Sequence, residues 1–79
     1  MRILDNDNDK KLDTVGLFLT KEELIQLKAD IDSLIQNPKN QHTHLSSEDY
    51  QKEITVCIYD PKNLEGLHDR CKCLIEKDE

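Results

Sequence analysis

The clearest structural signal in this chain lies at residues 20–38, which read TKEELIQLKADIDSLIQNP. Thr20 and Glu23 have the spacing of a capping box, in which each side chain bonds the backbone N–H of the other at the start of a helix. Asn37 and Pro38 end the helix, because the residue before a proline avoids helical backbone. The stretch therefore predicts a helix that starts after Thr20 and stops at Asn37.

Apolar residues recur within this helix at spacings that place them on one face. We expect this face to pack on a sheet, while the charged residues of the opposite side meet water. The apolar residues are Leu24, Leu27, Ile31, Leu34 and Ile35, and the charged ones include Lys21, Glu22, Asp30 and Asp32.

A polar run of alternating Asp and Asn at residues 5–9 separates two apolar stretches near the start of the chain. Asp and Asn favour turns, because they tolerate left-handed backbone and bond their own main chain. Apolar side chains alternate with a period of two over residues 13–19, which is typical of a strand. The sequence therefore predicts a β-hairpin with strands at residues 2–4 and 13–19.

The C-terminal half predicts one more strand and one more helix. Residues 53–59, EITVCIY, are rich in β-branched and aromatic side chains, and the polar segment before them, 38–49, is expected to be a connection. Asp60 and Pro61 suit the N-cap and the first position of a helix. The apolar stripe of that helix would consist of Leu64, Leu67, Cys71, Leu74 and Ile75.

The predicted order of elements is therefore β-β-α-β-α. Three strands and two amphipathic helices favour an α+β two-layer sandwich, in which a three-stranded sheet has both helices on one face. The connection through the first helix would make the second and third strands parallel, and the sequence leaves open which strand the third one pairs with. A chain of 79 residues is expected to form a single domain, 1–79.

One face of such a sheet would stay uncovered. It would carry Phe18, Cys57 and Tyr59, together with Ile3 or Leu4. Exposed apolar patches often mark interfaces, and a domain of this size has little core of its own. We expect a homodimer that forms through this face or through the sheet edge; the alternative is the scattered apolar surface of an ordinary monomer.

The charge balance limits the classes of partner. Eleven Lys and Arg against 17 Asp and Glu give a formal net charge of −6, which argues against binding duplex nucleic acid. No apolar run is long enough to cross a membrane. The acidic residues, Asp30 and Asp32 among them, could attract a basic protein or could serve only solubility. The charged start of the chain and three cysteines, expected to be reduced, favour a cytoplasmic protein.

His42 and His44 form the one candidate metal site. The spacing His-x-His puts two imidazoles on one side of an extended segment. A zinc site would need a third ligand, for which His68, Asp49 or Cys57 could serve. The alternative is that the histidines only make hydrogen bonds within the loop.

Other chemical motifs are incomplete. The run at residues 5–9 matches alternate positions of a calcium loop, but Lys10 and Gly16 stand where glycine and glutamate are required. Cys71 and Cys73 would diverge on a helix, with Cys71 buried and Cys73 exposed. The sequence contains no phosphate loop and no nucleophile with its base and orienting group, so we expect no cofactor and no enzymatic activity.

Several segments together resemble small uncharacterised α+β domains encoded by Gram-positive bacteria and their prophages. The segments are residues 17–23 (LFLTKEE), Asn37-Pro38, His42-Thr43-His44 and residues 53–59. Some such domains are similar to immunity proteins, which neutralise toxins. The resemblance implies a protein that acts by occupying a partner's surface, and the two histidines suggest the alternative of a metal-binding or small-ligand-binding protein.

Overall fold

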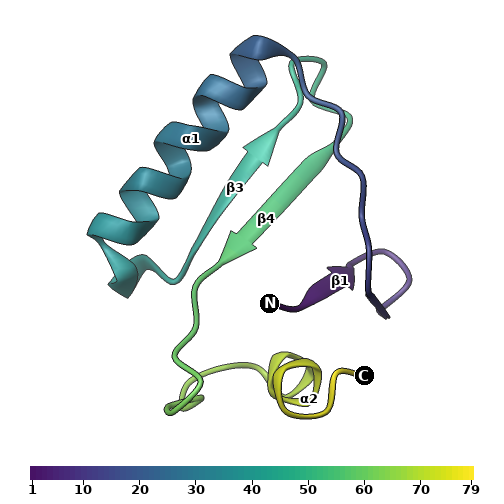
Figure 1. Cartoon of the computed structure of the whole chain (residues 1–79), viewed down its shortest axis with the longest axis vertical. Helices are drawn as coiled ribbons and strands as arrows, with labels where there is room; N and C mark the ends of the chain where they lie inside the picture. Colours follow the sequence, from purple (N-terminus) through teal and green to yellow (C-terminus); the bar gives the residue numbers. More distant parts are fainter. The chain divides into compact units, whose positions relative to one another are not determined.

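The computed structural model describes the backbone of residues 1–79 and every side chain except that of Asn40. Contacts divide the chain into two compact units: Met1–Leu17 with Asp60–Glu79, and Phe18–Tyr59. That residues 1–79 form one domain stays a prediction. The elements, labelled in Figure 1 where there is room, are β1 (Ile3–Asp5), β2 (Lys10–Leu12), α1 (Lys21–Gln36), the short 3-10 helix η1 (Pro38–Asn40), β3 (His42–Ser46), β4 (Glu53–Cys57) and α2 (Asp69–Lys77).

The helix predicted after Thr20 is confirmed as α1. The Thr20 hydroxyl accepts a hydrogen bond from the backbone N–H of Glu23 at 3.2 Å, and the Glu23 carboxylate accepts one from the backbone N–H of Thr20 at 2.8 Å. The helix ends at Gln36, and the chain turns through Asn37 into η1, which begins at Pro38. The capping box and the proline therefore define both ends of α1.

β3 and β4 form an antiparallel hairpin in the same unit, in a register that runs from His42 opposite Cys57 to Ser46 opposite Glu53. α1 packs along β3, as Figure 1 shows. Leu34 of α1 and Leu45 of β3 are both buried. The core of the unit Phe18–Tyr59 is therefore the layer between one face of this hairpin and α1.

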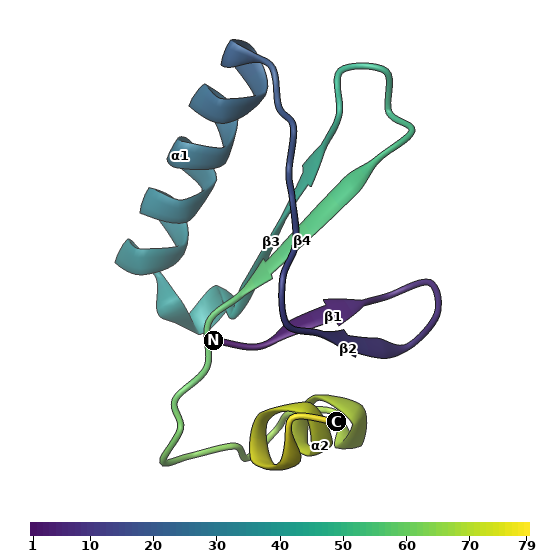
Figure 2. The same cartoon turned by 45° about the vertical axis from the view of Figure 1, so that its right-hand side comes forward.

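β1 and β2 form the hairpin of the other unit, with Ile3 opposite Leu12, and the two strands lie side by side in Figure 2. The polar run between them forms the turn, as predicted. The carboxylate of Asp5 accepts hydrogen bonds from the backbone N–H groups of Asp7 at 3.0 Å and Asn8 at 3.2 Å. This is the local side-chain-to-backbone bonding that makes Asp a turn residue.

α2 begins eight residues later than predicted, at Asp69 instead of Pro61. The Asp60 carboxylate accepts a hydrogen bond from the N–H of Lys62 at 2.9 Å and makes a turn instead of a helix cap, because both structures use the same side-chain contact. Gly66 then adopts a φ of +86°, a conformation that favours glycine and interrupts any helix. The N-cap of α2 is His68, whose Nδ1 accepts from the N–H of Arg70 at 3.2 Å.

The predicted β-β-α-β-α sandwich is wrong. The described backbone has two separate two-stranded antiparallel sheets, and no three-stranded sheet covered by two helices. Residues 13–19 form no strand, because the tight turn pairs Lys10–Leu12 with β1 directly. β4 pairs with β3, its neighbour along the chain, so the predicted parallel pair is also absent from the described backbone.

The assignment of the two helical cysteines is reversed as well. Cys71 is exposed and Cys73 is half-buried. The predicted stripe assumed a helix from Asp60, but only its last part is helical, and the buried side of α2 centres on Leu74.

Candidate functional site

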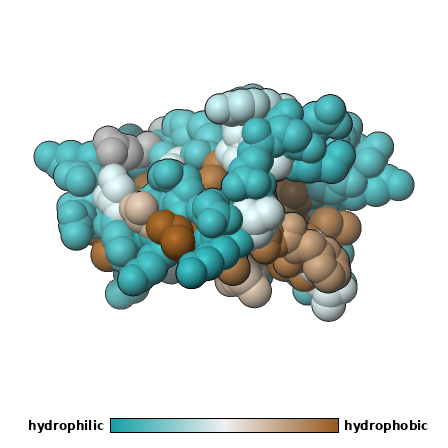
Figure 3. Space-filling view, turned by 90° about the horizontal axis from the view of Figure 1, so that it is seen from above, coloured by the Kyte–Doolittle hydropathy of each residue, from teal (hydrophilic) through white to brown (hydrophobic). Residues whose placement is uncertain are grey.

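Most apolar side chains of α1 lie on two neighbouring lines, and only one of these lines is covered. Ile25 lies on neither line and is 59% exposed. Leu34 is buried and Leu27 is half-buried. Leu24, Ile31 and Ile35 are 53%, 37% and 64% exposed. Their spacings of seven and four residues place these three on one line along the helix, here called the outer stripe. Figure 3 shows hydrophobic side chains reaching the surface beside hydrophilic ones.

Lysines border the outer stripe. Lys21 and Lys28 lie three residues before and four residues after Leu24, so both neighbour it on the helix surface, and both are exposed. Asp32 follows Lys28 by four residues on the same border. The outer stripe therefore has a mainly basic rim, although the chain as a whole carries a net charge of −6.

Glu23 ties the start of α1 to the loop between β3 and β4. One carboxylate oxygen accepts from the N–H of Thr20, and the other accepts from the N–H of Glu48 at 2.9 Å. The backbone hydrogen bond from Thr20, and then that from Glu48, lower the pKa of Glu23 below its ordinary value. The ionised carboxylate thus caps α1 and fixes the helix against the hairpin that it covers.

The loop that Glu23 contacts presents an exposed aromatic side chain. Ser47 donates a hydrogen bond to the carboxylate of Asp49, and the Ser47 hydroxyl accepts from the N–H of Lys52 at 3.0 Å. The bond from Ser47 lowers the pKa of Asp49, with a further contribution from the N–H of Gln51. Tyr50 lies in this loop at a φ of +60° and is exposed. No strand or helix pattern in the sequence includes Tyr50, so its exposure was not predicted.

The residues predicted for partner binding do not share a sheet face. Phe18 is 99% exposed but belongs to no strand. Cys57 ends β4 and is exposed, and Tyr59 lies beyond β4 and is half-buried. On α1, Asp30 is half-buried and accepts a side-chain hydrogen bond within its own helix, whereas Asp32 is exposed beside the outer stripe.

His42 and His44 lie on the side of β3 that alternates with the buried Leu45. Their ring centroids are 5.0 Å apart with an edge-on arrangement. The Nδ1 atom of His44 lies 2.8 Å from a carboxylate oxygen of Glu53 and 2.9 Å from the hydroxyl of Thr55. A carboxylate only accepts hydrogen bonds, so Nδ1 carries a hydrogen and Nε2 of neutral His44 has a free lone pair.

The residues expected to supply a third metal ligand do not join His42 and His44 in a metal site. Cys57 lies opposite His42 in the hairpin register, His68 caps α2, and Asp49 accepts from Ser47. Among the described side chains, no group of three His, Cys, Asp or Glu residues has an arrangement that could hold a metal ion.

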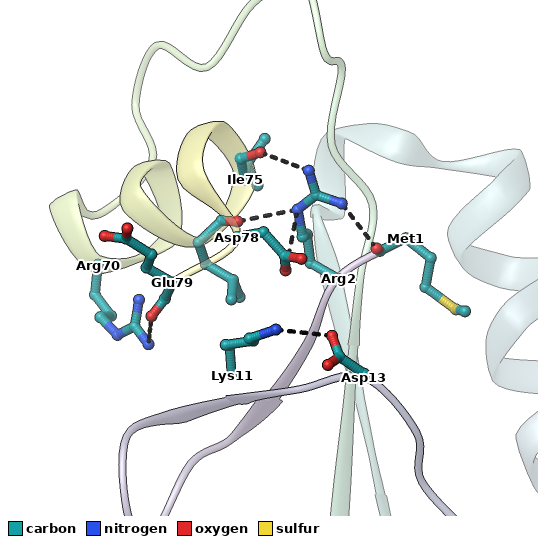
Figure 4. A network of polar contacts seen from close by, with 9 residues as sticks. Met1, Arg2, Lys11, Asp13, Arg70, Ile75, Asp78 and Glu79 are labelled. Carbon is teal, nitrogen blue, oxygen red and sulfur yellow. Dashed lines mark hydrogen bonds and ion pairs between the residues drawn. The ribbon is translucent and has the colours of Figure 1, made fainter.

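In the unit that contains both chain ends, Arg2 caps the end of α2. Its guanidinium donates to the backbone carbonyls of Leu74 at 3.0 Å and Ile75 at 3.1 Å, and it lies 3.6 Å from the carboxylate of Asp78 (Figure 4). The last carbonyls of a helix lack partners within the helix, and an arginine supplies donors for them. No local sequence pattern indicates this contact, because its residues are more than 70 positions apart.

Arg70 makes a second link between α2 and the β1–β2 hairpin. It donates to the carboxylate of Asp9 in the β1–β2 turn and to the backbone carbonyl of Glu79 at 2.9 Å. The hydrogen bond to Asp9 raises the pKa of Arg70. These arginine contacts hold the unit together around the buried Leu74.

No protein-family model, curated protein or solved structure matches this chain. The resemblance to prophage and immunity-like domains therefore stays a prediction. Among the described residues, no helix has both the length and the apolar character that a membrane crossing requires.

Proposed function

We propose that this protein is a non-enzymatic binding protein that acts by protein–protein association through the outer stripe of α1. One observation carries the proposal: Leu24, Ile31 and Ile35 form a row of aliphatic side chains that are 37–64% exposed. Single apolar residues on a surface are ordinary, but a contiguous row of them is typical of an interface. An immunity-like or inhibitor-like role in the cytoplasm would use the same row.

The way α1 is held also supports a binding role. The capping box fixes the start of the helix, and Glu23 fixes it to the hairpin loop through Glu48. A helix that is already formed loses little conformational entropy when it docks, so more of the burial energy remains as affinity. An amphipathic helix that lays one face into a partner's groove is a recurring mode of recognition.

The earlier expectation of a basic partner fits this surface poorly. Lys21 and Lys28 border the outer stripe, so a basic partner would meet like charge at the rim. Attraction of a basic protein by the overall charge of −6 stays a prediction for other parts of the surface.

The test compares two matched substitutions in α1. Ile35→Glu puts a charge on the outer stripe, and Ala29→Glu adds the same charge on the exposed side away from the stripe and from β3. Tagged wild-type and variant chains are expressed together with an untagged copy in bacterial cells, and the proteins that co-purify are quantified. We expect a protein, either the untagged copy or another one, that wild type and Ala29→Glu retain and Ile35→Glu loses.

The proposal fails if no co-purifying protein depends on Ile35. Circular dichroism of both variants controls for folding, because each should keep the helical signal of α1. Ile35 is mostly exposed, so its replacement should leave the fold intact.

The two histidines support a second candidate, the binding of a divalent transition-metal ion. The observation in its favour is that Nδ1 of His44 lies 2.8 Å from the Glu53 carboxylate, which leaves Nε2 of the neutral ring as a ligand, and that the ring of His42 lies 5.0 Å from that of His44. Imidazole nitrogens suit zinc, copper and nickel, and carboxylate partners of this kind commonly orient metal-binding histidines. Two protein ligands leave the remaining positions to water, so we expect weak binding.

Calorimetric titration with Zn²⁺ tests this candidate. We expect binding to wild type and to His68→Ala, and loss of binding in His44→Ala. His68 is the control because it is an exposed histidine outside the pair. Absence of heat with wild type, or equal binding by His44→Ala, would exclude a metal site at this pair.

A further inference from the structure

We infer that the partner of the outer stripe is the outer stripe of a second copy, with the two α1 helices packed antiparallel. This inference rests on the proposed function, because it names the partner for the same surface. It depends on three features of α1: the spacing of the stripe, the position of Lys28 on its border between Leu24 and Ile31, and the charges at its rim.

The spacing is that of a helix–helix seam. Lys21, Leu24, Lys28, Ile31 and Ile35 follow one another at intervals of three, four, three and four residues. This alternation keeps a line of side chains facing a second helix in a coiled coil. The covered residues Leu27 and Leu34 lie on a different line, so α1 can pack on β3 and on a second helix at the same time.

Lys28 selects the antiparallel orientation. In a parallel pair, Lys28 would face Lys28 of the second copy in the middle of the seam, where like charges are unfavourable. In an antiparallel pair, Leu24 faces Ile35 of the second copy and Lys28 faces its Ile31. The methylene groups of Lys28 can then cover that isoleucine while the ammonium group stays in water.

Charge complementarity at the rim favours a copy of this chain as the partner. In the antiparallel pair, Lys28 lies opposite Ile31 of the second copy. Asp32 is the next residue of that copy, and it lies on the same border of the seam as Lys28. Lys28 and Asp32 are both exposed, and the described contacts give neither of them an ion pair within its own chain. Two Lys28–Asp32 pairs would therefore form across the dimer without breaking an existing pair.

Sedimentation equilibrium of the purified chain measures the association. We expect wild type and Ala29→Glu to form dimers and Ile35→Glu to remain monomeric under the same conditions. A wild-type chain that stays monomeric at every concentration, or a dimer that Ile35→Glu leaves intact, overturns the inference.

A mixing experiment isolates the pairing between copies. Lys28→Glu places an acidic group opposite Asp32 of the second copy, and Asp32→Lys places a basic group opposite its Lys28. Like charges then face each other across the dimer, so each variant alone should dimerise about tenfold more weakly than wild type. An equimolar mixture should recover the wild-type affinity, because each Lys28–Asp32 pair again has opposite charges. Mixing cannot restore a Lys28–Asp32 pair within one helix, so recovery of affinity identifies a contact between copies. Absence of heterodimers in the mixture overturns the inference.

The orientation has its own signature in NMR spectra. In a sample that mixes isotope-labelled and unlabelled chains, the antiparallel pair predicts an intermolecular contact between the methyl groups of Leu24 and Ile35. A dimer without this contact contradicts the arrangement.

The two proposals can fail separately. If the wild-type chain is monomeric while a different protein still co-purifies in an Ile35-dependent manner, the second-copy inference is wrong and the proposed function holds. If neither self-association nor an Ile35-dependent partner is found, both are wrong.

Discussion

Truncation of two adjacent residues in α1 should have very different effects on stability. Leu34 is 6% exposed and belongs to the layer between α1 and the β3–β4 hairpin, whereas Ile35 is 64% exposed and belongs to the outer stripe. We predict that Leu34→Ala strongly destabilises the unit Phe18–Tyr59 and that Ile35→Ala does not. Comparison of the two variants tests whether the outer stripe is uncovered in the single chain.

The magnitudes follow from burial. Truncation of a buried leucine to alanine costs about 2–5 kcal/mol, and the lower part of this range, about 2–3 kcal/mol, applies because a single thin layer can partly close over the space. Only about a third of the Ile35 side chain is covered, which corresponds to about 0.5–1 kcal/mol of burial. The better helix propensity of alanine offsets part of this loss, so the net effect of Ile35→Ala is within about 0.5 kcal/mol of zero.

Urea titration followed by tyrosine fluorescence measures both variants. The chain has two tyrosines and no tryptophan, and Tyr50 and Tyr59 both lie in the unit Phe18–Tyr59, so the signal reports on that unit. Low protein concentration keeps the chain monomeric. If Ile35→Ala lost as much stability as Leu34→Ala, the outer stripe would be covered within its own chain, and the reasoning for a docking surface would be refuted.

Three further predictions concern contacts within one or the other of the two units. Thr20→Ala should lower the urea stability of the unit Phe18–Tyr59 by about 1 kcal/mol through loss of the helix cap, whereas Thr14→Ala, outside any helix or strand, should change it little. The lowered pKa of Glu23 means that its ionised form stabilises the fold above the pKa of the unfolded chain and that this contribution disappears as the pH falls through the lower folded value. Urea titrations at several acidic pH values should therefore show a weaker pH dependence for Glu23→Gln than for wild type, and equal dependence would contradict the bonding described. Arg2→Ala should speed amide hydrogen exchange in α2 by about tenfold, because charged hydrogen bonds to its last carbonyls are lost, while Lys11→Ala should not; unchanged exchange in Arg2→Ala would show that the cap is not needed.

α1 was predictable because its signals are local and mutually consistent. The capping box at Thr20 and Glu23 and the proline at position 38 fix the ends through contacts between residues close in sequence. The turn at residues 5–9 was predictable for the same reason, since the Asp5 carboxylate bonds its own main chain. Where one local interaction is sufficient to form a structure, the sequence pattern identifies it.

The strands were not predictable in the same way. Residues 13–19 alternate like a strand, but pairing is decided by the turn, which places Lys10–Leu12 opposite β1. β3 is only five residues long and contains two histidines, so its alternation of inward and outward side chains gave no clear apolar pattern. Asp60 shows a further limit, because a helix cap and an isolated turn have the same sequence signature.

Part of the candidate site could be predicted from the sequence. The pattern identified Leu24, Ile31 and Ile35 but assigned them, with Leu27 and Leu34, to one covered face, whereas a two-stranded hairpin is too narrow to cover them all. It did not include Ile25, which is 59% exposed. The exposed interface was instead expected on a sheet face with Phe18, Cys57 and Tyr59, and that expectation depended on a third strand that the described backbone does not have. The link between His44 and Glu53 also depends on the register of β3 and β4, which the sequence did not specify.

Sedimentation equilibrium of the wild-type chain tests the dimer through the outer stripe most directly. The mass is measured beside that of Ile35→Glu at concentrations from about 10 μM to about 1 mM, the range of weak helix–helix association. The outer-stripe dimer predicts that the wild-type mass rises from the 9.2 kDa of one chain towards twice that value, while the variant stays at 9.2 kDa. A wild-type mass that stays at 9.2 kDa throughout, or a variant that associates as wild type does, would contradict the claim.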